Sequence, residues 1–462
     1  MKKIFDEVRS LDKKAIENYF LSEDILMEHA SIGIQKYITK KFKKNEKILI
    51  VSGTGNNGAD GIALARLLHK RFDVSLYLTN EPKTEIGKLQ LKRAKSINVN
   101  FVKDIFQADI IVDCIFGTGL NKELDKNSID LIEKLNNFKS FKIACDIPSG
   151  LDILGRVTTI AFKANVTITM GVLKTALFSD VAKDYVGKIK VTKLGIEDEF
   201  FQSTLTNKYL LEKSDLVLPY RNIENSHKGT YGHLNVISGE KVGASIISSM
   251  AAFSFGAGLV TIISENQKSI PHLIMQDKVI SKNCTAIAIG MGLGKIDDSK
   301  LENILKLKLP KVLDADIFYN KLILEYLNEY VVLTPHPKEF ISLLKLANIA
   351  DITIEELQNN RFKYVKEFCN KYPYVVLLLK GSNVIIAQDD NIYINSFGNS
   401  SLSKGGSGDV LSGLIASLLA QGYKRVEGCI SASLAHTLSA LNYSKNNYSL
   451  TPDDLIEGIK NL

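Results

Sequence analysis

The segment KGGSGD, residues 404–409, places a carboxylic acid after three glycines and immediately before the apolar helical run VLSGLIASLLAQG. Glycines allow several backbone N–H groups to converge on developing negative charge, and the dipole of the following helix adds to that effect. A carboxylate beside such an anion hole is suited to accept the proton of a hydroxyl group that is being phosphorylated. Asp409 is therefore a candidate catalytic base; the simpler alternative is that it only caps the helix.

A second glycine-rich segment, GTGNNG at residues 53–58, follows the strand-like run KILIVS and opens a helix. This is the G-x-G-x-x-G pattern in the context that dinucleotide binding requires, with pyrophosphate at a helix N-terminus. Asn56, Asn57 and Asp60 add oxygen atoms where a plain dinucleotide loop offers only backbone N–H groups. A carboxylate there would repel pyrophosphate unless a cation or a specific hydroxyl lies between them. Helix capping is the alternative interpretation of the two asparagines.

Two further strand-like runs carry carboxylates near their ends. The run ADIIVDCIF holds Asp113 and leads into the turn 117–119, and FKIACDIPSG places Asp146 shortly before Ser149. A carboxylate within an apolar strand is costly unless it is paired or binds a cation. Since the carboxyl ends of parallel strands meet in one crevice, these oxygen atoms should gather there. An oxygen-only set suits a hard cation and disfavours zinc.

His336 lies between two prolines in the segment LTPHPKEF. Each proline biases the residue before it towards an extended conformation, which holds the ring at a strand end. A lone histidine is most often structural, but this context favours contact with a ligand. The chain has no G-x-x-x-x-G-K-[ST] motif, so a P-loop enzyme is disfavoured.

Short apolar strand-like runs alternate with amphipathic helical runs in both halves of the chain. The strand-like runs lie at residues 47–52, 73–79, 108–116, 141–148 and 165–170, and then at 232–238, 258–264, 286–290, 310–316, 330–335, 374–380 and 383–388. In the first half, nearly continuous apolar strands separated by helices predict a parallel sheet that is covered on both faces. The stretch 197–227 is polar and irregular. We therefore expect two α/β domains: 1–205, with a Rossmann-like sheet and an N-terminal helical layer, and 206–462.

The composition narrows the class of protein. A chain of 462 residues is too long for one hydrophobic core. The net charge of +7 is spread among acidic residues, and neither a signal peptide nor a membrane span is visible. The five cysteines form no C-x-x-C pair, which argues against disulfides and zinc. We expect a cytoplasmic homo-oligomer that binds neither nucleic acid nor membranes.

The motifs of the first half, GNNGADG, VDCIFGTGL and DIPSGLD, resemble in order and spacing the epimerase domain of the bifunctional NAD(P)H-hydrate repair enzymes, the YjeF N-terminal fold. By this resemblance Asn57, Asp113 and Ser149 contribute to a potassium site. The resemblance also implies a set of substrate-binding residues, with Asp146 handling protons. That set is Asn56, Asn57, Gly58, Ala59, Asp60, Gly117, Thr118, Gly119, Leu120, Asn121, Lys122, Glu123 and Asp146. Ala59 stands where the family usually has glycine.

The motifs of the second half, HKGTYGHLNVISG, LDAD, LTPHPKEF and LLKGSNVII together with GGSGD, resemble the ribokinase-like dehydratase domain of the same enzymes. The implied nucleotide-binding residues are Lys380, Gly381, Ser382, Asn383, Val384 and Gly408. The residues implied to face the hydrated cofactor are Ala244, Gly292, His336 and Asp409. Met291 replaces the proline of the usual G-P-G turn. The co-substrate is ADP or ATP, with ADP preferred, and Mg²⁺ is expected with it.

The resemblance implies repair of hydrated NADH and NADPH. One domain would interconvert the R and S forms, and the other would dehydrate the S form, converting ADP to AMP and phosphate. Two rival functions remain open. One is a kinase that phosphorylates a vitamin or sugar hydroxyl, which would accumulate a phosphorylated product. The other is a binding role without catalysis for the first half, against which the intact Asp113, Asp146 and Ser149 argue.

Overall fold

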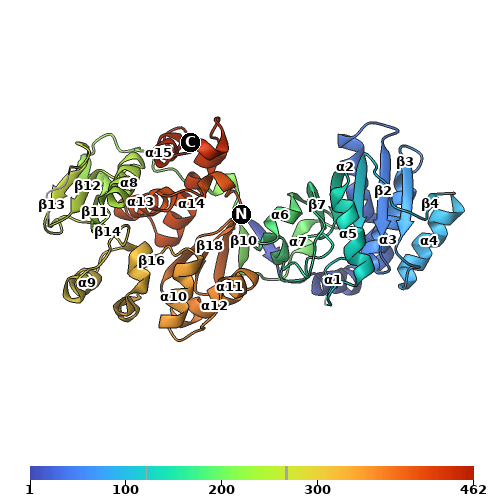
Figure 1. The fold of residues 1–462 in the computed structure, drawn as a ribbon, viewed down its shortest axis with the longest axis horizontal. Helices are drawn as coiled ribbons and strands as arrows, with labels where there is room; N and C mark the ends of the chain where they lie inside the picture. Colours follow the sequence, from blue (N-terminus) through green and yellow to red (C-terminus); the bar gives the residue numbers. More distant parts are fainter. Residues whose placement is uncertain (121, 266–268) are drawn as a thin grey trace. The chain divides into compact units, whose positions relative to one another are not determined.

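The protein was analysed as a computed structural model that describes residues 1–120, 122–265 and 269–462. The chain divides into two compact units, Lys3–Thr206 and Asn207–Leu462, the second of which also includes Met1–Lys2. Figure 1 follows the chain through both units. No helix within the described residues is long and apolar enough to cross a membrane. All five cysteines are free and buried.

The unit Lys3–Thr206 is built on a parallel sheet whose strand order is β4-β3-β2-β5-β6-β7-β9, with β1 and β8 forming a separate short parallel pair. Its strands are β1 (Lys2–Phe5), β2 (Lys47–Ser52), β3 (Asp73–Leu78), β4 (Asn100–Val102), β5 (Ile110–Cys114), β6 (Phe141–Cys145), β7 (Val166–Met170), β8 (Leu173–Lys174) and β9 (Lys188–Thr192). Its helices are α1 (Arg9–Tyr19), α2 (Glu23–Lys41), α3 (Asn56–Leu68), α4 (Glu85–Ser96), α5 (Lys126–Asn137), α6 (Lys183–Val186) and α7 (Asp198–Phe201).

Both faces of this sheet are buried. Ile48 and Ile50 of β2 pack in a cluster with apolar residues of α1 to α4, whereas Leu49 and Val51 pack with residues of α5. This division follows from strand geometry, because successive side chains point to opposite faces of a sheet. The continuous apolar run KILIVS is therefore explained by helices on both sides, as the sequence predicted.

The unit Asn207–Leu462 holds a mixed sheet with the strand order β13-β12-β11-β14-β15-β16-β17-β18-β19-β10. Its strands are β10 (Lys208–Leu210), β11 (His233–Ile237), β12 (Leu259–Ile263), β13 (Met275–Asp277), β14 (Ala286–Ile289), β15 (Lys311–Leu313), β16 (Val331–Leu333), β17 (Val376–Leu379), β18 (Val384–Gln388) and β19 (Asn391–Asn395). Its helices are α8 (Val242–Ser254), α9 (Asp298–Leu305), α10 (Pro337–Leu346), α11 (Ile354–Asn359), α12 (Arg361–Lys371), α13 (Ser407–Ala420), α14 (Arg425–Leu441) and α15 (Pro452–Ile459).

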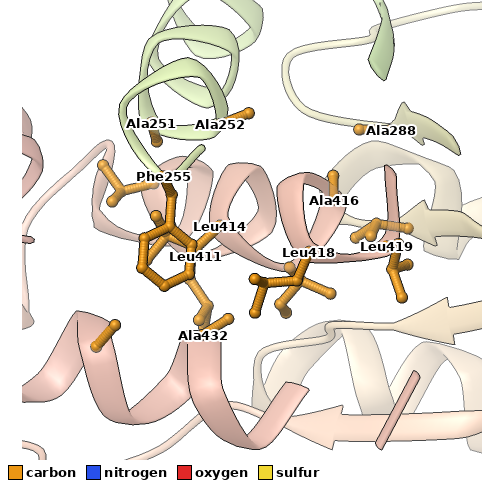
Figure 2. Packing of buried hydrophobic residues seen from close by; sticks show 14 of the residues in the cluster. Ala251, Ala252, Phe255, Ala288, Leu411, Leu414, Ala416, Leu418, Leu419 and Ala432 are labelled. Atoms are coloured by element: carbon orange, nitrogen blue, oxygen red, sulfur yellow. The ribbon is translucent and has the colours of Figure 1, made fainter. Parts of the chain in front are cut away.

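Helix α13 lies at the centre of this second unit, and nearly every residue from Val410 to Ala420 is buried. Figure 2 shows Leu411 and Leu414 of α13 beside Phe255, which follows α8. At Gly413 the two helices approach so closely that a Cβ atom would lie 2.2 Å from the carbonyl oxygen of Ser248. This packing holds α13 rigidly, and the same helix carries Asp409 in its first turn.

Two candidate active sites

The three residues expected to bind potassium are joined by a continuous set of hydrogen bonds. Ser149 donates to both carboxylate oxygens of Asp113, from Oγ at 2.6 Å and from its backbone N–H at 2.8 Å. The backbone N–H of Phe116 donates to Ser149 Oγ at 2.8 Å, and the Phe116 carbonyl accepts from Asn57 Nδ2 at 3.0 Å. Strand β5, the turn after β6 and the start of α3 thus place the three side chains together.

The chemistry of this set fits a hard monovalent cation. Asn57 Oδ1 is buried and has no hydrogen-bond partner among the described residues, and a buried amide oxygen of this kind is costly unless something is bound to it. Burial raises the pKa of Asp113 to about 6, although its bonds from Ser149 and Ile115 act in the opposite direction. A bound cation would favour the ionised carboxylate. No group of three or more His, Cys, Asp or Glu within the described ranges is arranged to hold a metal ion.

A cavity of about 840 Å³ opens beside this cluster. Ten of the residues predicted to bind the epimerase substrate line it: Asn56, Asn57, Asp60, Gly117, Thr118, Gly119, Leu120, Lys122, Glu123 and Asp146. Gly58 and Ala59 are buried and do not line the cavity. A Cβ atom on Gly58 would lie 2.0 Å from the Gly53 carbonyl oxygen, so glycine is needed there to fold the loop back against its own strand. The predicted Asn121 falls outside the described residues.

Asp146 is held in an unusual backbone conformation at the end of β6, with φ of 67°. Its Oδ1 atom accepts three hydrogen bonds: from Lys174 Nζ at 2.5 Å, from the Met170 N–H at 3.0 Å and from Thr169 Oγ1 at 3.2 Å. The Lys174 side chain is only 4% exposed, so this ion pair is shielded from solvent. A positive φ in a residue other than glycine is typical of functional sites, where surrounding contacts enforce it.

Two further carboxyl groups line the same cavity. Asp60, on α3, is almost fully buried, and burial together with the charge of Asp146 raises its pKa well above the usual range. Asp12, on α1, has its pKa raised to about 6, chiefly by burial. The sequence analysis missed Asp12 and Lys174, because neither lies in a motif and each reaches the cavity from a distant part of the chain.

Four of the residues predicted for the dehydratase site follow the carboxyl ends of four strands in a row of five. These strands, β11, β14, β15, β16 and β17, run parallel side by side in that order. Ala244 follows β11, Gly292 follows β14, His336 follows β16 and Lys380 follows β17. Ligands in open α/β sheets bind at this edge.

Asp409 lies in the first turn of α13, after Gly406, which has φ of 88°. Burial raises the pKa of Asp409 to about 7, and the charge of Asp314 contributes in the same direction while that of Lys380 opposes it. A carboxylate with this pKa is well suited to act as a general base near neutral pH.

Asp314, in the LDAD segment after β15, lies between the predicted base and the predicted nucleotide-binding residues. Its Oδ1 accepts from Lys380 Nζ at 2.6 Å, and its Oδ2 accepts from Ser412 Oγ at 2.6 Å. A Cβ atom on Gly408 would lie 3.3 Å from Lys380 Nζ, so the lysine reaches the start of α13. The structure therefore brings Lys380, Gly408 and Asp409 together around Asp314.

The loop 380–384 joins β17 to β18 and is fixed from behind by Arg361. The Arg361 guanidinium is buried and donates to the carbonyl oxygens of Asn383 and Lys380, both at 2.9 Å. Gly381 and Ser382 lie between these two anchored positions and are exposed. Sequence reasoning found the loop but missed Arg361, which begins α12 and lies in no motif.

His336 begins α10 as its N-cap, with Nδ1 accepting the N–H groups of Lys338 and Glu339. Its Nε2 lies 3.1 Å from Glu339 Oε1, and the Glu339 carboxylate accepts the His336 N–H at 2.7 Å. Burial raises the pKa of Glu339 to about 7 and lowers the pKa of His336. The structural role of His336 as a cap is thus observed, and its half-exposed ring remains available to a ligand.

Gly292 has φ of 60°, and a Cβ atom there would lie 2.5 Å from the Lys241 carbonyl oxygen and 3.1 Å from the Ala244 Cβ. Gly292 and Ala244 are therefore neighbours, as expected of two residues that contact one ligand. Met291, in place of the family's proline, is fully buried in the core. The departure from the G-P-G turn is thus accommodated by packing of the methionine side chain.

The two sites define a two-domain α/β enzyme with nucleotide-type ligands in both halves, and comparison with known proteins identifies the family. The chain belongs to the bifunctional NAD(P)H-hydrate repair enzymes. It is 44% identical to the bifunctional NAD(P)H-hydrate repair enzyme Nnr of Helicobacter pylori over the whole length of both chains. It is 32% identical to the Nnr of Coxiella burnetii, across 94% of this chain and 93% of that one.

The two halves match different family descriptions. Residues 23–176 match the YjeF-related protein N-terminus, and residues 234–461 match NAD(P)H-hydrate dehydratase. Among solved structures, the second half is similar to an ADP/ATP-dependent NAD(P)H-hydrate dehydratase from Bacillus subtilis that was co-crystallised with ATP/Mg²⁺. That similarity has 24% identity and a TM-score of 0.46, and it covers 56% of this chain and 98% of the other.

Proposed function

We propose that residues 3–206 interconvert the R and S forms of hydrated NADH and NADPH, and that residues 207–462 dehydrate the S form at the expense of ADP or ATP. Repair of NAD(P)H hydrates is the activity of the family to which the chain belongs. The assignment of one activity to each unit is supported by the separate sheets and by the separate sets of buried carboxylates described above.

Dehydration needs a good leaving group, because hydroxide leaves the C6 position of the reduced ring poorly. Asp409 takes the proton of the C6 hydroxyl, whose oxygen then attacks the terminal phosphorus of the nucleotide. The C6 phosphate ester departs as inorganic phosphate when the lone pair of the ring nitrogen forms a C=N bond. Loss of one ring proton restores the dihydropyridine, so ADP and hydrated cofactor give AMP, phosphate and NAD(P)H.

The observation that carries this assignment is the position of Asp409. Its carboxylate lies in the first turn of α13 beside the glycine-rich loop, and burial raises its pKa to about 7. Lys380, paired with Asp314, supplies positive charge near the same loop. Backbone N–H groups and a lysine around a base form the arrangement that phosphoryl transfer requires. Mg²⁺ would arrive with the nucleotide, since this ion binds phosphates in preference to all-protein cages.

In the first unit, a potassium ion would be held by Asn57, Asp113 and Ser149. The ion would supply positive charge beside the cavity and would favour the ionised carboxylate of Asp113. Asn57 Oδ1, buried without a partner in the described structure, is the observation that supports this cation. Asp146 handles protons while C6 inverts, and its ion pair with Lys174 orients it.

The decisive experiment is incubation of the full chain with a mixture of the two NADH hydrate epimers and either ADP or ATP. Absorbance of the restored NADH should rise in two phases, the second of which reports epimerisation. Accumulation of a phosphorylated product without free phosphate would favour a small-molecule kinase instead. The homo-oligomer and the cytoplasmic location expected from the sequence stay predictions, to be tested by light scattering and by fractionation.

A further inference from the structure

Asp12 lies on α1 and lines the 840 Å³ cavity together with Asp60, Asp146 and Lys174. Its backbone N–H bonds to the carbonyl of Val8, within the first turn of the helix. The Asp12 carboxylate belongs neither to the predicted potassium site of Asn57, Asp113 and Ser149 nor to the predicted substrate-binding residues. An acidic side chain half-buried in a ligand cavity with no structural task is a candidate for acid–base chemistry.

The charges near Asp12 come from several elements. Lys174 lies in β8, Asp146 follows β6, Glu23 begins α2, and Glu7 lies in the segment before α1. Asp60 of α3 also interacts with Asp12, whose charge helps to raise the Asp60 pKa. Burial is the main cause that raises the pKa of Asp12 to about 6. The charges of Asp146, Glu7 and Glu23 raise this pKa further, and the charge of Lys174 lowers it. Asp12 therefore keeps its proton at a higher pH than an exposed aspartate does, up to about pH 6.

Asp146 differs from Asp12 in its surroundings. All three of its observed side-chain bonds, from Lys174, Met170 and Thr169, end on Oδ1. Oδ2 stands outside this set of bonds. Asp146 is therefore held in place through one oxygen atom, and Oδ2 is the oxygen that we expect to meet a reacting water molecule.

We infer that Asp12 is the second acid–base residue of the epimerase site and works with Asp146 on opposite faces of the substrate ring. This inference rests on the proposed epimerase function of the first unit. Inversion at one carbon requires a group on each face, and here the two carboxyl groups reach the cavity from different elements, α1 and the end of β6.

Inversion at C6 proceeds by loss of one water molecule and addition of another. Asp12 gives its proton to the C6 hydroxyl, the C6–O bond breaks, and the lone pair of the ring nitrogen forms a C=N bond as water leaves. A second water attacks C6 from the other face, forms the new C6–O bond, and gives a proton to Asp146. The nitrogen recovers its lone pair. Solvent returns a proton to Asp12 and removes one from Asp146, so no oxidant or co-reactant is needed.

The test uses the full-length chain with Asp12→Asn, which keeps nearly the same shape but removes the acid. The slow phase of NADH recovery, which reports conversion of the R to the S form, should fall by about a hundredfold or more with little change in KM. The fast phase, which reports dehydration of the S form in the other unit, should be unchanged. Asp12→Glu should recover part of the slow phase.

The matched control is Glu17→Gln, which removes an exposed carboxylate from the same helix α1. It should leave both phases unchanged. A merely structural role for Asp12 would lower the melting temperature and leave the pH profile of the residual epimerase activity intact. The wild-type rate should fall as pH rises above about 6, because Asp12 then loses the proton that it donates, and Asp12→Asn should lack this limb.

Two different negative results would have different meanings for the epimerase function and for the role of Asp12. A wild-type chain that recovers no NADH beyond the initial S form would overturn the proposed epimerase function, and the role of Asp12 with it. A wild-type chain with a clear slow phase, matched by an equally active Asp12→Asn variant, would overturn the role of Asp12 alone and leave the epimerase assignment standing.

Discussion

Nζ of Lys380 lies 2.6 Å from Oδ1 of Asp314, and the two residues follow strands β17 and β15 of the same sheet. The Asp314 side chain is only 2% exposed. Breaking a buried ion pair leaves one charge without compensation. Both members also act on the pKa of Asp409, so under the proposed mechanism this pair would link nucleotide binding to the protonation of the base.

Asp314→Asn should therefore shift the pH dependence of dehydration. Asp314 raises the pKa of Asp409 and Lys380 lowers it, so removal of the aspartate charge should bring the pKa of Asp409 below about 7. The ionised base would then persist at lower pH, and the rising limb of kcat/KM against pH should move to more acidic values. An unchanged midpoint would mean that a group other than Asp409 controls the limb.

Asp409→Asn tests the base directly. Positioned general bases typically contribute about 10²–10⁴-fold, or roughly 3–5 kcal/mol of barrier, so dehydration should fall by at least about a hundredfold. Nucleotide binding, measured by calorimetry, and epimerisation should both persist. The N-cap of α13 is Gly406, so a purely structural role for Asp409 would be the favourable interaction of its charge with the helix N-terminus. The loss would then be one of stability, about 1 kcal/mol or less, with near-normal turnover.

The same variant should also change the dependence of stability on pH. A folded-state pKa of about 7, raised from 3.8, means that the folded protein binds this proton more tightly than the unfolded chain does. The wild-type unit should therefore lose stability as pH rises from about 4 to about 7. Asp409→Asn should show less of this loss when its melting temperature is measured across that range.

Epimerisation should depend on potassium and not on zinc. Asn57, Asp113 and Ser149 offer oxygen ligands without a thiolate or imidazole, so zinc chelators should have no effect. Replacing potassium in the buffer with a bulky organic cation should slow the epimerase phase, and Asp113→Ala should remove the response. Full activity without potassium in both the variant and the wild type would rule out this site.

Arg361→Lys should weaken nucleotide binding more than it slows turnover. The guanidinium donates to two carbonyl oxygens of the loop 380–384 from a buried position, and lysine cannot reproduce that fork. We expect KM for ADP to rise about tenfold, while kcat at saturating ADP changes little. A loss confined to kcat would show that Arg361 acts on the chemistry and not on the loop.

The two units should fold separately. Each contains its own sheet and its own buried clusters, so fragments 1–206 and 207–462 should be stable on expression. The first fragment should epimerise and the second should dehydrate, and a mixture should repair both epimers. Two insoluble fragments would count against this division of labour.

The elements were largely predictable because their signal is local. The run KILIVS was expected as a strand at 47–52, and β2 occupies those residues. Helix α3 begins at Asn56, within the glycine-rich segment 53–58, and a Cβ atom on Gly58 or Gly61 of this helix would lie 2.0 or 2.5 Å from a neighbouring atom. Glycines read as loop residues can thus belong to a first helical turn.

The site residues that the sequence analysis did not predict have partners that are far away along the chain. Lys174 pairs with Asp146, 28 positions earlier, and Asp314 pairs with Lys380, 66 positions later. Arg361 reaches the carbonyl of Asn383 across 22 positions. Motif spacing reports only groups that lie on one loop, whereas these pairs exist only after the sheets have brought their strand ends together.

Because all five thiols are buried, their reactivity can be used to measure unfolding of the chain. Burial raises the pKa of Cys284 to about 11 and that of Cys369 to about 12, and thiols kept protonated in this way react poorly with disulfide reagents. Cys114 and Cys145 belong to the first unit, and Cys284, Cys369 and Cys429 belong to the second. The native protein should not react with a chromogenic thiol reagent. During gradual denaturation, unfolding of the first unit would expose two reactive thiols per chain, and unfolding of the second would expose three. The number of thiols that react in each step would therefore identify the unit that had unfolded.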